Sequence, residues 1–245
     1  MITQGAALPP ATVTYVDQVN KPIAIAAVMD NSGSLTKSPV AFADMKTGFS
    51  NLIGAMKPTD IAQVMKFATD YEITQPFTSN KTLLQTAINA PFNKGELTLL
   101  YDTVYKAVDD TALQTTFRRA VIVATDGIDE GPTVGVPLST HTLPQVIANA
   151  QAKGVAIFTI GLGASVNATA LGQMASSTGG IFYQASASQN LATIYQQLSS
   201  LLFERQYVVT FTVAGAPASP TPVTIAATSG GVSGNGTKSA TTCGP

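Results

Sequence analysis

Continuous apolar runs rich in β-branched residues alternate with helical patterns along most of this chain. The runs IAIAAVM (23–29), RAVIVAT (119–125) and VAIFTIGLG (155–163) lack the polar alternation of a strand with one wet face. Strands of this kind are buried on both faces, as in parallel sheets that helices cover. Amphipathic patterns between the runs predict those helices. The sequence therefore predicts an α/β fold with a doubly wound, mostly parallel sheet and helices on both faces.

The predicted elements follow one another from residue 23 to about residue 203. We expect strands at 23–29, 61–69, 71–78, 119–125, 155–163 and 180–185. We expect helices at 81–88, 99–109, 143–154, 168–177 and 188–204, and one after the first strand whose apolar face carries Phe42, Met45, Phe49, Leu52 and Ile53. Almost no linker separates 61–69 from 71–78, so this pair is predicted to be an antiparallel hairpin.

Composition and pattern divide the chain into three parts. The α/β alternation indicates one domain at residues 20–205. The segments 11–18 and 206–228 alternate polar and apolar residues, and we expect them to pair into a small β module outside the main sheet. Residues 229–245 are rich in Gly, Ser and Thr and are predicted to be a flexible tail. Two chain ends that leave the domain together predict an insertion into a longer protein.

The overall composition argues against several classes of function. Charged residues are 11% of the chain, against about 25% in typical soluble domains, which favours an extracellular or cell-surface setting, with the periplasm as an alternative. A net charge of −1 without a basic patch argues against nucleic acid as a partner. No apolar run reaches the ~20 residues of a membrane span. The single Cys243 cannot form an internal disulfide, and its role stays open.

Oxygen-bearing side chains gather where two predicted strands end and where one predicted helix begins. They are Asp30, Ser32, Ser34, Thr98 and Asp126. Asp30 and Asp126 follow the first and fourth strands. In a sheet of order 3-2-1-4-5-6 these two strands flank the point where the strand order reverses, which is where open α/β sheets bind ligands. We therefore expect the five side chains to meet.

This set offers only oxygen ligands, which a hard cation such as Mg²⁺ prefers. Two carboxylates balance the charge of a dication. If the hydroxyls bind it directly and the carboxylates act through water, the metal stays electron-poor and recruits a carboxylate from a partner. The residues alone leave a structural alternative open, in which Ser32 is a helix N-cap and Asp126 is a turn residue.

The motifs resemble those of the von Willebrand factor type A domain, the family that includes integrin inserted domains. The metal-ion-dependent adhesion site of this family has the pattern D-x-S-x-S, then a Thr, then an Asp. The segment DNSGS matches at Asp30, Ser32 and Ser34, LTLLYDTVYKAV matches at Thr98, and VIVATDGID matches at Asp126.

The resemblance covers about residues 20–205. It implies binding of Mg²⁺ or Mn²⁺, with Ca²⁺ as a weaker candidate, and a protein ligand that offers an Asp or Glu carboxylate. One departure is Glu96-Leu97, where many members of the family have Gly-Gly before the Thr. This departure leaves the geometry of the loop at Thr98 open.

Three functions compete on this evidence. The leading hypothesis is a metal-dependent binding or adhesion module without catalysis. The alternative is an assembly or chaperone component of a larger intracellular or periplasmic machine, as in other members of the family. The third is a hydrolase that uses Ser32 or Ser34 with His141, the only histidine. The sequence has no G-x-S-x-G elbow, and we interpret His141 as a surface residue.

Other motifs receive structural interpretations. The segment GLGASV (161–166) has the place of a dinucleotide-binding turn but lacks the third Gly and the later acidic residue, so we interpret it as a tight turn. Asp129 and Glu130 are interpreted as solvated. The remaining interpretations are an exposed helix face for Asp102, Asp109 and Asp110, and packing for Tyr101, Tyr105 and Tyr195.

Overall fold

The structure is a computed structural model, and the chain divides into two compact units, Lys21–Glu204 and the two chain ends. The described residues are 2–4, 6–7, 12–15, 21–126, 128–133, 135–163, 166–185, 188–203, 207–210, 221–229 and 232–240. Among the helices of these ranges, none combines the length and the apolar character that a membrane span requires.

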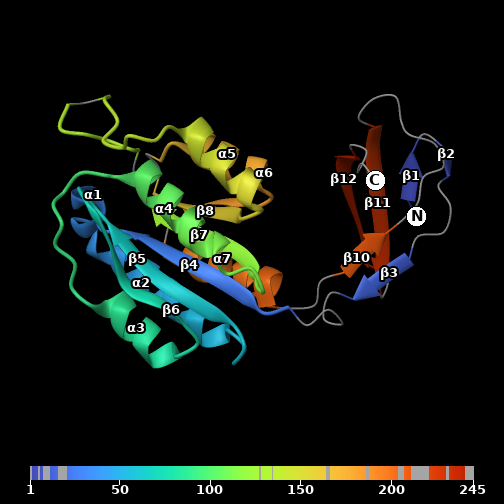
Figure 1. The fold of residues 1–245 in the computed structure, drawn as a ribbon, viewed down its shortest axis with the longest axis horizontal. Coiled ribbons are helices and arrows are strands. Elements are labelled where there is room, and N and C mark those ends of the chain that lie inside the picture. The colour runs from blue at the N-terminus through green and yellow to red at the C-terminus, as the bar shows by residue number, and fades with distance from the viewer. Residues whose placement is uncertain are drawn as a thin grey trace. The chain divides into compact units, whose positions relative to one another are not determined.

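The larger unit is built on a six-stranded sheet with the order β6-β5-β4-β7-β8-β9 (Figure 1). Its strands are β4 (Ile23–Asp30), β5 (Ile61–Phe67), β6 (Tyr71–Thr78), β7 (Arg118–Thr125), β8 (Ala156–Leu162) and β9 (Phe182–Ala185). All neighbours are parallel except β5 and β6, which are antiparallel. In chain order this is 3-2-1-4-5-6, so the predicted sheet and hairpin are confirmed. The strand order reverses between β4 and β7.

Seven helices are described in the larger unit. They are α1 (Gly33–Thr36), α2 (Pro39–Ala55), α3 (Lys81–Asn89), α4 (Leu100–Ala112), α5 (Leu143–Lys153), α6 (Ala168–Thr178) and α7 (Ser188–Phe203). Buried side chains of α2, α3 and α7 form one core with one face of the sheet. Those of α4, α5 and α6 form a second core with the other face, and Figure 1 shows these two layers of helices.

Successive side chains of β4 pack alternately into the two cores. Ile25 and Ala27 pack in the core under α2 and α7, whereas Ala26 and Val28 pack in the core under α4. All eight residues of β4 are buried, which explains why the strand reads as a continuous apolar run. Asp30 is the last of these buried residues, so its carboxylate lies at the edge of both cores.

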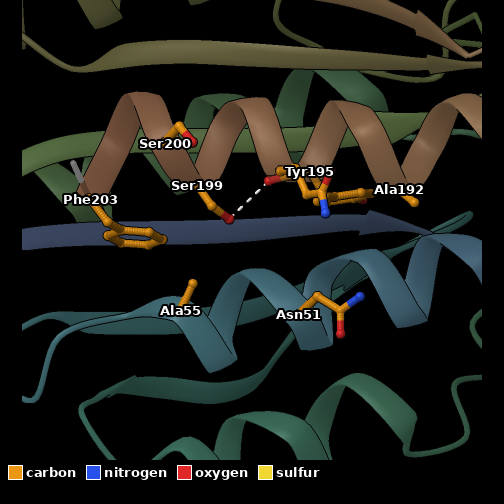
Figure 2. Close-up of a pocket in the computed structure, with 8 residues that line it drawn as sticks. Asn51, Ala55, Ala192, Tyr195, Ser199, Ser200 and Phe203 are labelled. Carbon is orange, nitrogen blue, oxygen red and sulfur yellow. Dashed lines mark hydrogen bonds between the residues drawn. The ribbon is translucent and has the colours of Figure 1, made fainter.

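Helices α2 and α7 approach each other closely because Gly48 faces Tyr195. A Cβ atom built on Gly48 would lie 2.0 Å from the Tyr195 ring. The ring also makes an edge-to-face contact with Phe49, with 5.3 Å between centroids. Beside this contact runs a groove (Figure 2), lined by Asn51, Ala55, Ala192, Tyr195, Gln196, Ser199, Ser200 and Phe203. The interpretation of Tyr195 as a packing residue agrees with its burial.

We expect the substitution Gly48→Ala to lower the free energy of unfolding by about 2 kcal/mol, because the added methyl group must push α2 from α7. Gly54→Ala is the control in the same helix, since a Cβ atom there meets nothing within 4 Å. The control should gain up to about 1 kcal/mol through helix propensity. Urea unfolding of both variants measures the difference, and equal stabilities would contradict the tight contact.

The described strands of the chain ends pair with one another. Strand β3 (Thr12–Tyr15) pairs antiparallel with β10 (Tyr207–Thr210). A separate sheet has the order β12-β11-β1-β2. Its strands are β1 (Ile2–Gln4), β2 (Ala6–Ala7), β11 (Thr221–Ser229) and β12 (Val232–Ala240). That these strands form one stable module stays a prediction, and residues 211–220 lie outside the described residues.

The prediction of a flexible tail at 229–245 differs from the structure. Strand β12 pairs with β11 from Ser229↔Val232 to Thr221↔Ala240. The sequence between the paired ends is Gly-Gly, a dipeptide that favours tight hairpins. Backbone pairing of this kind needs no apolar side chains, so a composition of Gly, Ser and Thr did not reveal it. The last five residues, 241–245, lie outside the described residues.

Candidate metal centre

The candidate site lies at the carboxyl ends of β4 and β7, where the strand order reverses. Asp30 ends β4, and Asp126 directly follows Thr125, the last residue of β7. Helix α1 follows β4 at once, with Ser32 at its N-cap and Ser34 in its first turn. In Figure 1, α1 and the loop that follows β7 lie at the same end of the sheet. Parallel pairing of β4 with β7 thus places the two carboxylates side by side.

Hydrogen bonds join four of the five predicted site residues. The Ser34 hydroxyl donates to Asp126 Oδ1 at 3.0 Å, and its Oγ lies 3.2 Å from the Ser32 Oγ. The Ser32 backbone N–H donates to Asp30 Oδ1 at 2.7 Å. These contacts bring together the two ends of the sequence motif, Asp30 and Asp126, which are 96 positions apart in the chain.

Thr98 reaches the site through its backbone. It is buried and forms an isolated antiparallel bridge with Glu130, with N···O distances of 3.2 and 3.1 Å. Glu130 lies on the loop that follows Asp126. The structure therefore ties the segment of Thr98 to the segment of Asp126, and a direct part of the Thr98 hydroxyl in the site stays a prediction.

Thr125 is a contact of the site that sequence reasoning missed. Its hydroxyl donates to Asp30 Oδ2, so both oxygens of the buried carboxylate accept a hydrogen bond. Thr125 stands inside an apolar strand, where a threonine is an ordinary β-branched residue. Only the parallel register, which aligns the end of β7 with Asp30, reveals its role.

The loop before Thr98 packs against α1 at the departure from the family pattern. The Gly33 N–H donates to the Glu96 carbonyl oxygen at 2.9 Å. A Cβ atom on Gly33 would lie 2.9 Å from the Glu96 Cβ, so the close approach requires a glycine at position 33. The Glu96 side chain forms an exposed ion pair with Lys37, with 2.9 Å from Nζ to Oε2.

Burial makes the two carboxylates costly as anions. Asp30 is completely buried, and burial raises its pKa from 3.8 to about 6, although the hydrogen bonds from Ser32 and Thr125 act in the opposite direction. The negative charge of Asp126 adds to the increase. Burial also raises the pKa of Asp126. Among the described residues, the salt bridges involve other carboxylates.

The donor set suits a hard divalent cation. Two carboxylates and several hydroxyls offer oxygen ligands only, and a dication would offset the charge that burial disfavours. The described residues contain no cluster of three His, Cys, Asp or Glu side chains that could hold a metal ion. A cation in this part of the chain would therefore depend on the serine and threonine hydroxyls as well as on the carboxylates.

We expect the metal-free protein to lose stability as the pH rises through the pKa of Asp30. Between about pH 4 and pH 6 the folded state holds the proton more tightly than the unfolded state, so the free energy of unfolding falls with pH. For a pKa change from 3.8 to about 6, the loss is about 3 kcal/mol. Urea unfolding with a chelator measures it.

The isosteric variant Asp30→Asn is the control for this titration. It should be more stable than the wild type at pH 7, and the difference should vanish near pH 4, where Asp30 is protonated in the folded wild type. Parallel pH profiles for the two proteins would contradict the increase in the pKa of Asp30.

The interpretation of Asp129 as a solvated residue is wrong. Its side chain accepts hydrogen bonds from the N–H groups of Leu138, Ser139 and Tyr101 and from the Ser139 hydroxyl. Asp129 is 4% exposed, whereas its neighbour Glu130 is exposed as expected. The loop folds back onto the carboxylate, which a run of polar residues in the sequence does not indicate.

The predicted surface residue His141 belongs to a small cluster. Its Nδ1 lies 2.7 Å from Asp102 Oδ1, and its ring stacks on Tyr105 with 3.8 Å between centroids. Asp102 also accepts hydrogen bonds from the backbone N–H groups of Thr140 and His141, and these bonds lower its pKa against the effect of burial. Asp102 is thus engaged with the loop rather than free on an exposed helix face.

For the other acidic residues and for the predicted turn, the structure agrees better with the interpretation of the sequence. Asp109 and Asp110 are partly exposed on α4, and they pair with Lys153 and Lys106. In GLGASV, Gly163 has a φ of 94°, a conformation that suits a tight turn. The two residues 164–165 of this segment lie outside the described residues.

A comparison with protein-family models matches residues 24–197 to the von Willebrand factor type A domain. A comparison with curated protein sequences gave no significant match. The family match covers all five candidate site residues and the sheet and helices from the second residue of β4 to Gln197 in α7.

Solved structures share the fold at low sequence identity. Proximal thread matrix protein 1 from the mussel byssus has a TM-score of 0.65 and 19% identity, over 78% of this chain and 49% of its own. Another structure of that protein, with a zinc-occupied MIDAS motif, has a TM-score of 0.61 and 17% identity, over 74% and 48%. A von Willebrand factor type A protein from Catenulispora acidiphila has a TM-score of 0.66 and 11% identity, over 89% and 66%.

A bacterial surface protein is also similar. The pilus adhesin SpaC from Lactobacillus rhamnosus GG has a TM-score of 0.58 and 12% identity, over 74% of this chain and 30% of its own. The chain thus spans about half of the byssus protein and about a third of the adhesin. At these identities the likeness establishes the fold alone.

Proposed function

Because the chain belongs to the von Willebrand factor type A domain family, we propose that it is a metal-dependent protein-binding or adhesion module that recognises an acidic group on its partner. The observation that carries this proposal is the hydrogen-bonded set of Ser32, Ser34 and Asp126 beside the completely buried Asp30. Folding alone gives no reason to bury a carboxylate next to a second one.

The proposed ligands of the cation are Asp30, Ser32, Ser34, Thr98 and Asp126. Mg²⁺ or Mn²⁺ suits this oxygen-only set, and when bound it supplies a Lewis-acidic position that accepts a carboxylate oxygen. The Ser34 hydroxyl donates a hydrogen bond to Asp126, and with the Ser32 hydroxyl as donor to its oxygen, Ser34 keeps one lone pair for a cation. Asp30 is held through both of its oxygens and would keep its orientation whether or not a cation is present.

We expect Mn²⁺ and Mg²⁺ to bind with one site per chain, and Asp30→Asn to weaken the affinity by about a hundredfold, because it removes one of two negative charges from the site. Asp70→Asn is the matched control, since Asp70 is an exposed carboxylate in the turn between β5 and β6. Isothermal titration calorimetry measures all three proteins. Equal affinity of the wild type and Asp30→Asn would rule the site out.

Exposed aliphatic side chains on the segments beside the site support a protein as the partner. Val40, near the start of α2, is 62% exposed, and Ile128 and Val136, on the loop after β7, are 49% and 51% exposed. A small anion would gain nothing from them, whereas a protein surface would bury them around the central metal contact. We therefore propose a protein ligand with an Asp or Glu side chain set among apolar residues.

Selection of a random peptide library on the Mn²⁺-loaded protein tests the proposed ligand chemistry. Recovered peptides should contain Asp or Glu, should be released by a chelator, and should lose binding when that acidic residue becomes the amide. The Asp30→Asn protein should retain none of them. Peptides that stay bound in the chelator would count against a metal-mediated contact.

We propose no catalytic role for the serines. His141 is engaged with Asp102 and Tyr105, and the Ser34 hydroxyl is engaged with Asp126, which supports a binding function over a hydrolase. The proposed setting is extracellular or at a cell surface, within a longer protein. The low content of charged residues supports this setting, as does the fold shared with a byssus protein and a pilus adhesin.

A further inference from the structure

We propose that Asp129 is a positioning residue of the metal centre, which fixes the segment of Thr98 against the segment of Asp126. This inference rests on the proposed function, because it assigns Asp129 a role in holding two proposed ligands of the cation. Asp129 is not itself a ligand in this proposal. It acts through the backbone of the segments that carry Thr98 and Asp126.

The first support is the set of contacts around the carboxylate. Oδ1 accepts the backbone N–H groups of Leu138 and Ser139 at 2.7 and 2.9 Å. Oδ2 accepts the N–H of Tyr101 at 2.8 Å and the Ser139 hydroxyl. A carboxylate with 4% exposure and four donors is an anchor between α4 and the loop after β7.

The second support is that α4 has no cap of its own. Its N-cap residue, Leu99, has no side chain that can accept a hydrogen bond from the first turn. Asp129 accepts the Tyr101 N–H instead, and the Ser139 hydroxyl accepts the Asp102 N–H at 2.9 Å. The loop after β7 thus supplies the cap, and the negative charge of Asp129 lies at the positive end of the helix.

The third support is the place of this anchor next to the candidate ligands. Thr98 lies three residues before Tyr101, and its backbone is bridged to Glu130, the residue after Asp129. Asp126 lies three residues before Asp129. The bridge and the anchor together hold the two segments at adjacent points, so the spacing between Thr98 and Asp126 depends on them.

An asparagine at position 129 cannot replace these contacts. A carboxylate offers two acceptor oxygens, whereas an amide offers one acceptor and one NH₂ donor. The NH₂ group would face N–H donors, either of Tyr101 or of Leu138 and Ser139, and those contacts would be lost. The variant Asp129→Asn keeps the size of the side chain and releases one of the two segments.

Asp102→Asn is the matched control. Asp102 lies on α4 and anchors the same loop, through the N–H groups of Thr140 and His141 at 3.0 and 2.7 Å. It is also partly buried. Its loop contacts lie farther along the chain from Glu130 and Asp126 than those of Asp129. A variant at this position therefore loosens the loop without releasing the bridge at Thr98.

The experiment compares the full chain with the variants Asp129→Asn, Asp102→Asn, Thr98→Ala and the double variant Asp129→Asn/Thr98→Ala. Mn²⁺ affinity is measured from the electron paramagnetic resonance signal of the free ion. Amide hydrogen exchange of Thr98 and Glu130 is measured by NMR on the metal-free proteins. Thermal unfolding of the metal-free proteins monitors any general loss of stability.

We expect Asp129→Asn to weaken Mn²⁺ binding by about tenfold or more, as outer-sphere partners of metal ligands commonly do, and to speed exchange at both amides. Asp102→Asn should lower the thermal stability about as much as Asp129→Asn does, but it should change the Mn²⁺ affinity by less than about threefold. The loss of binding free energy in the double variant should be smaller than the sum of the two single losses, because part of the effect of Asp129 passes through the segment that carries Thr98.

Different outcomes overturn different parts of the account. Failure of the wild type to bind Mn²⁺ would overturn the proposed function and this inference with it. Wild-type binding with an unchanged affinity in Asp129→Asn, or additive effects in the double variant, would overturn the inference alone. If Asp129→Asn does not fold, Ser139→Ala removes one donor to Asp129 and should weaken binding by about threefold. An unchanged affinity in that variant would overturn the inference as well.

Discussion

The burial of Asp30 beside Asp126 is the constraint on which the rest of this structure depends. A buried carboxylate is unfavourable as an anion, and a second one nearby makes it more so. The protein offers Asp30 a backbone N–H and the Thr125 hydroxyl, yet its pKa remains near 6. Hydrogen bonds alone therefore do not offset the burial. An arrangement that costs stability in the metal-free protein is reasonable where a cation or a ligand completes it.

The sheet makes this arrangement geometrically simple. The reversal of strand order between β4 and β7 places two strand ends side by side with no helix crossing between them. The two strands are buried along most of their length, so the side chains at their ends stand on a rigid support. Less regular segments supply the other contacts, namely the short helix α1, the loop before α4 and the loop after β7. Packing of Glu96 against Gly33 and the bridge of Thr98 with Glu130 join these segments to each other.

The sequence alone predicted the mostly parallel sheet and placed Asp30, Ser32, Ser34 and Asp126 near one another at its edge, where hydrogen bonds join them. Strands buried on both faces read as apolar runs, and the residues that follow such runs must lie at one edge of a parallel sheet. The contacts of Thr125 and Asp129 could not be predicted in this way. Thr125 looks like any strand threonine, and its bond to Asp30 follows from the register of two strands far apart in the chain.

The sequence did not indicate which polar segments would be buried or paired with a strand. Asp129 stands in DGIDEG, which reads as solvated, and only the folding of residues 138–139 back onto it encloses the carboxylate. Strand β12 reads as a tail because its pairing with β11 uses the backbone, which every sequence offers. Both cases depend on long-range or backbone contacts that leave no periodic signal in the side chains.

Anomalous diffraction from a crystal grown with Mn²⁺ tests the central claim most directly. The account predicts one strong anomalous peak at the carboxyl ends of β4 and β7, in contact with the hydroxyls of Ser32 and Ser34 and adjacent to Asp30 and Asp126. An open or water-filled position on the ion should face away from the protein. A map without a peak at this place, at Mn²⁺ concentrations that saturate binding in solution, would contradict the account.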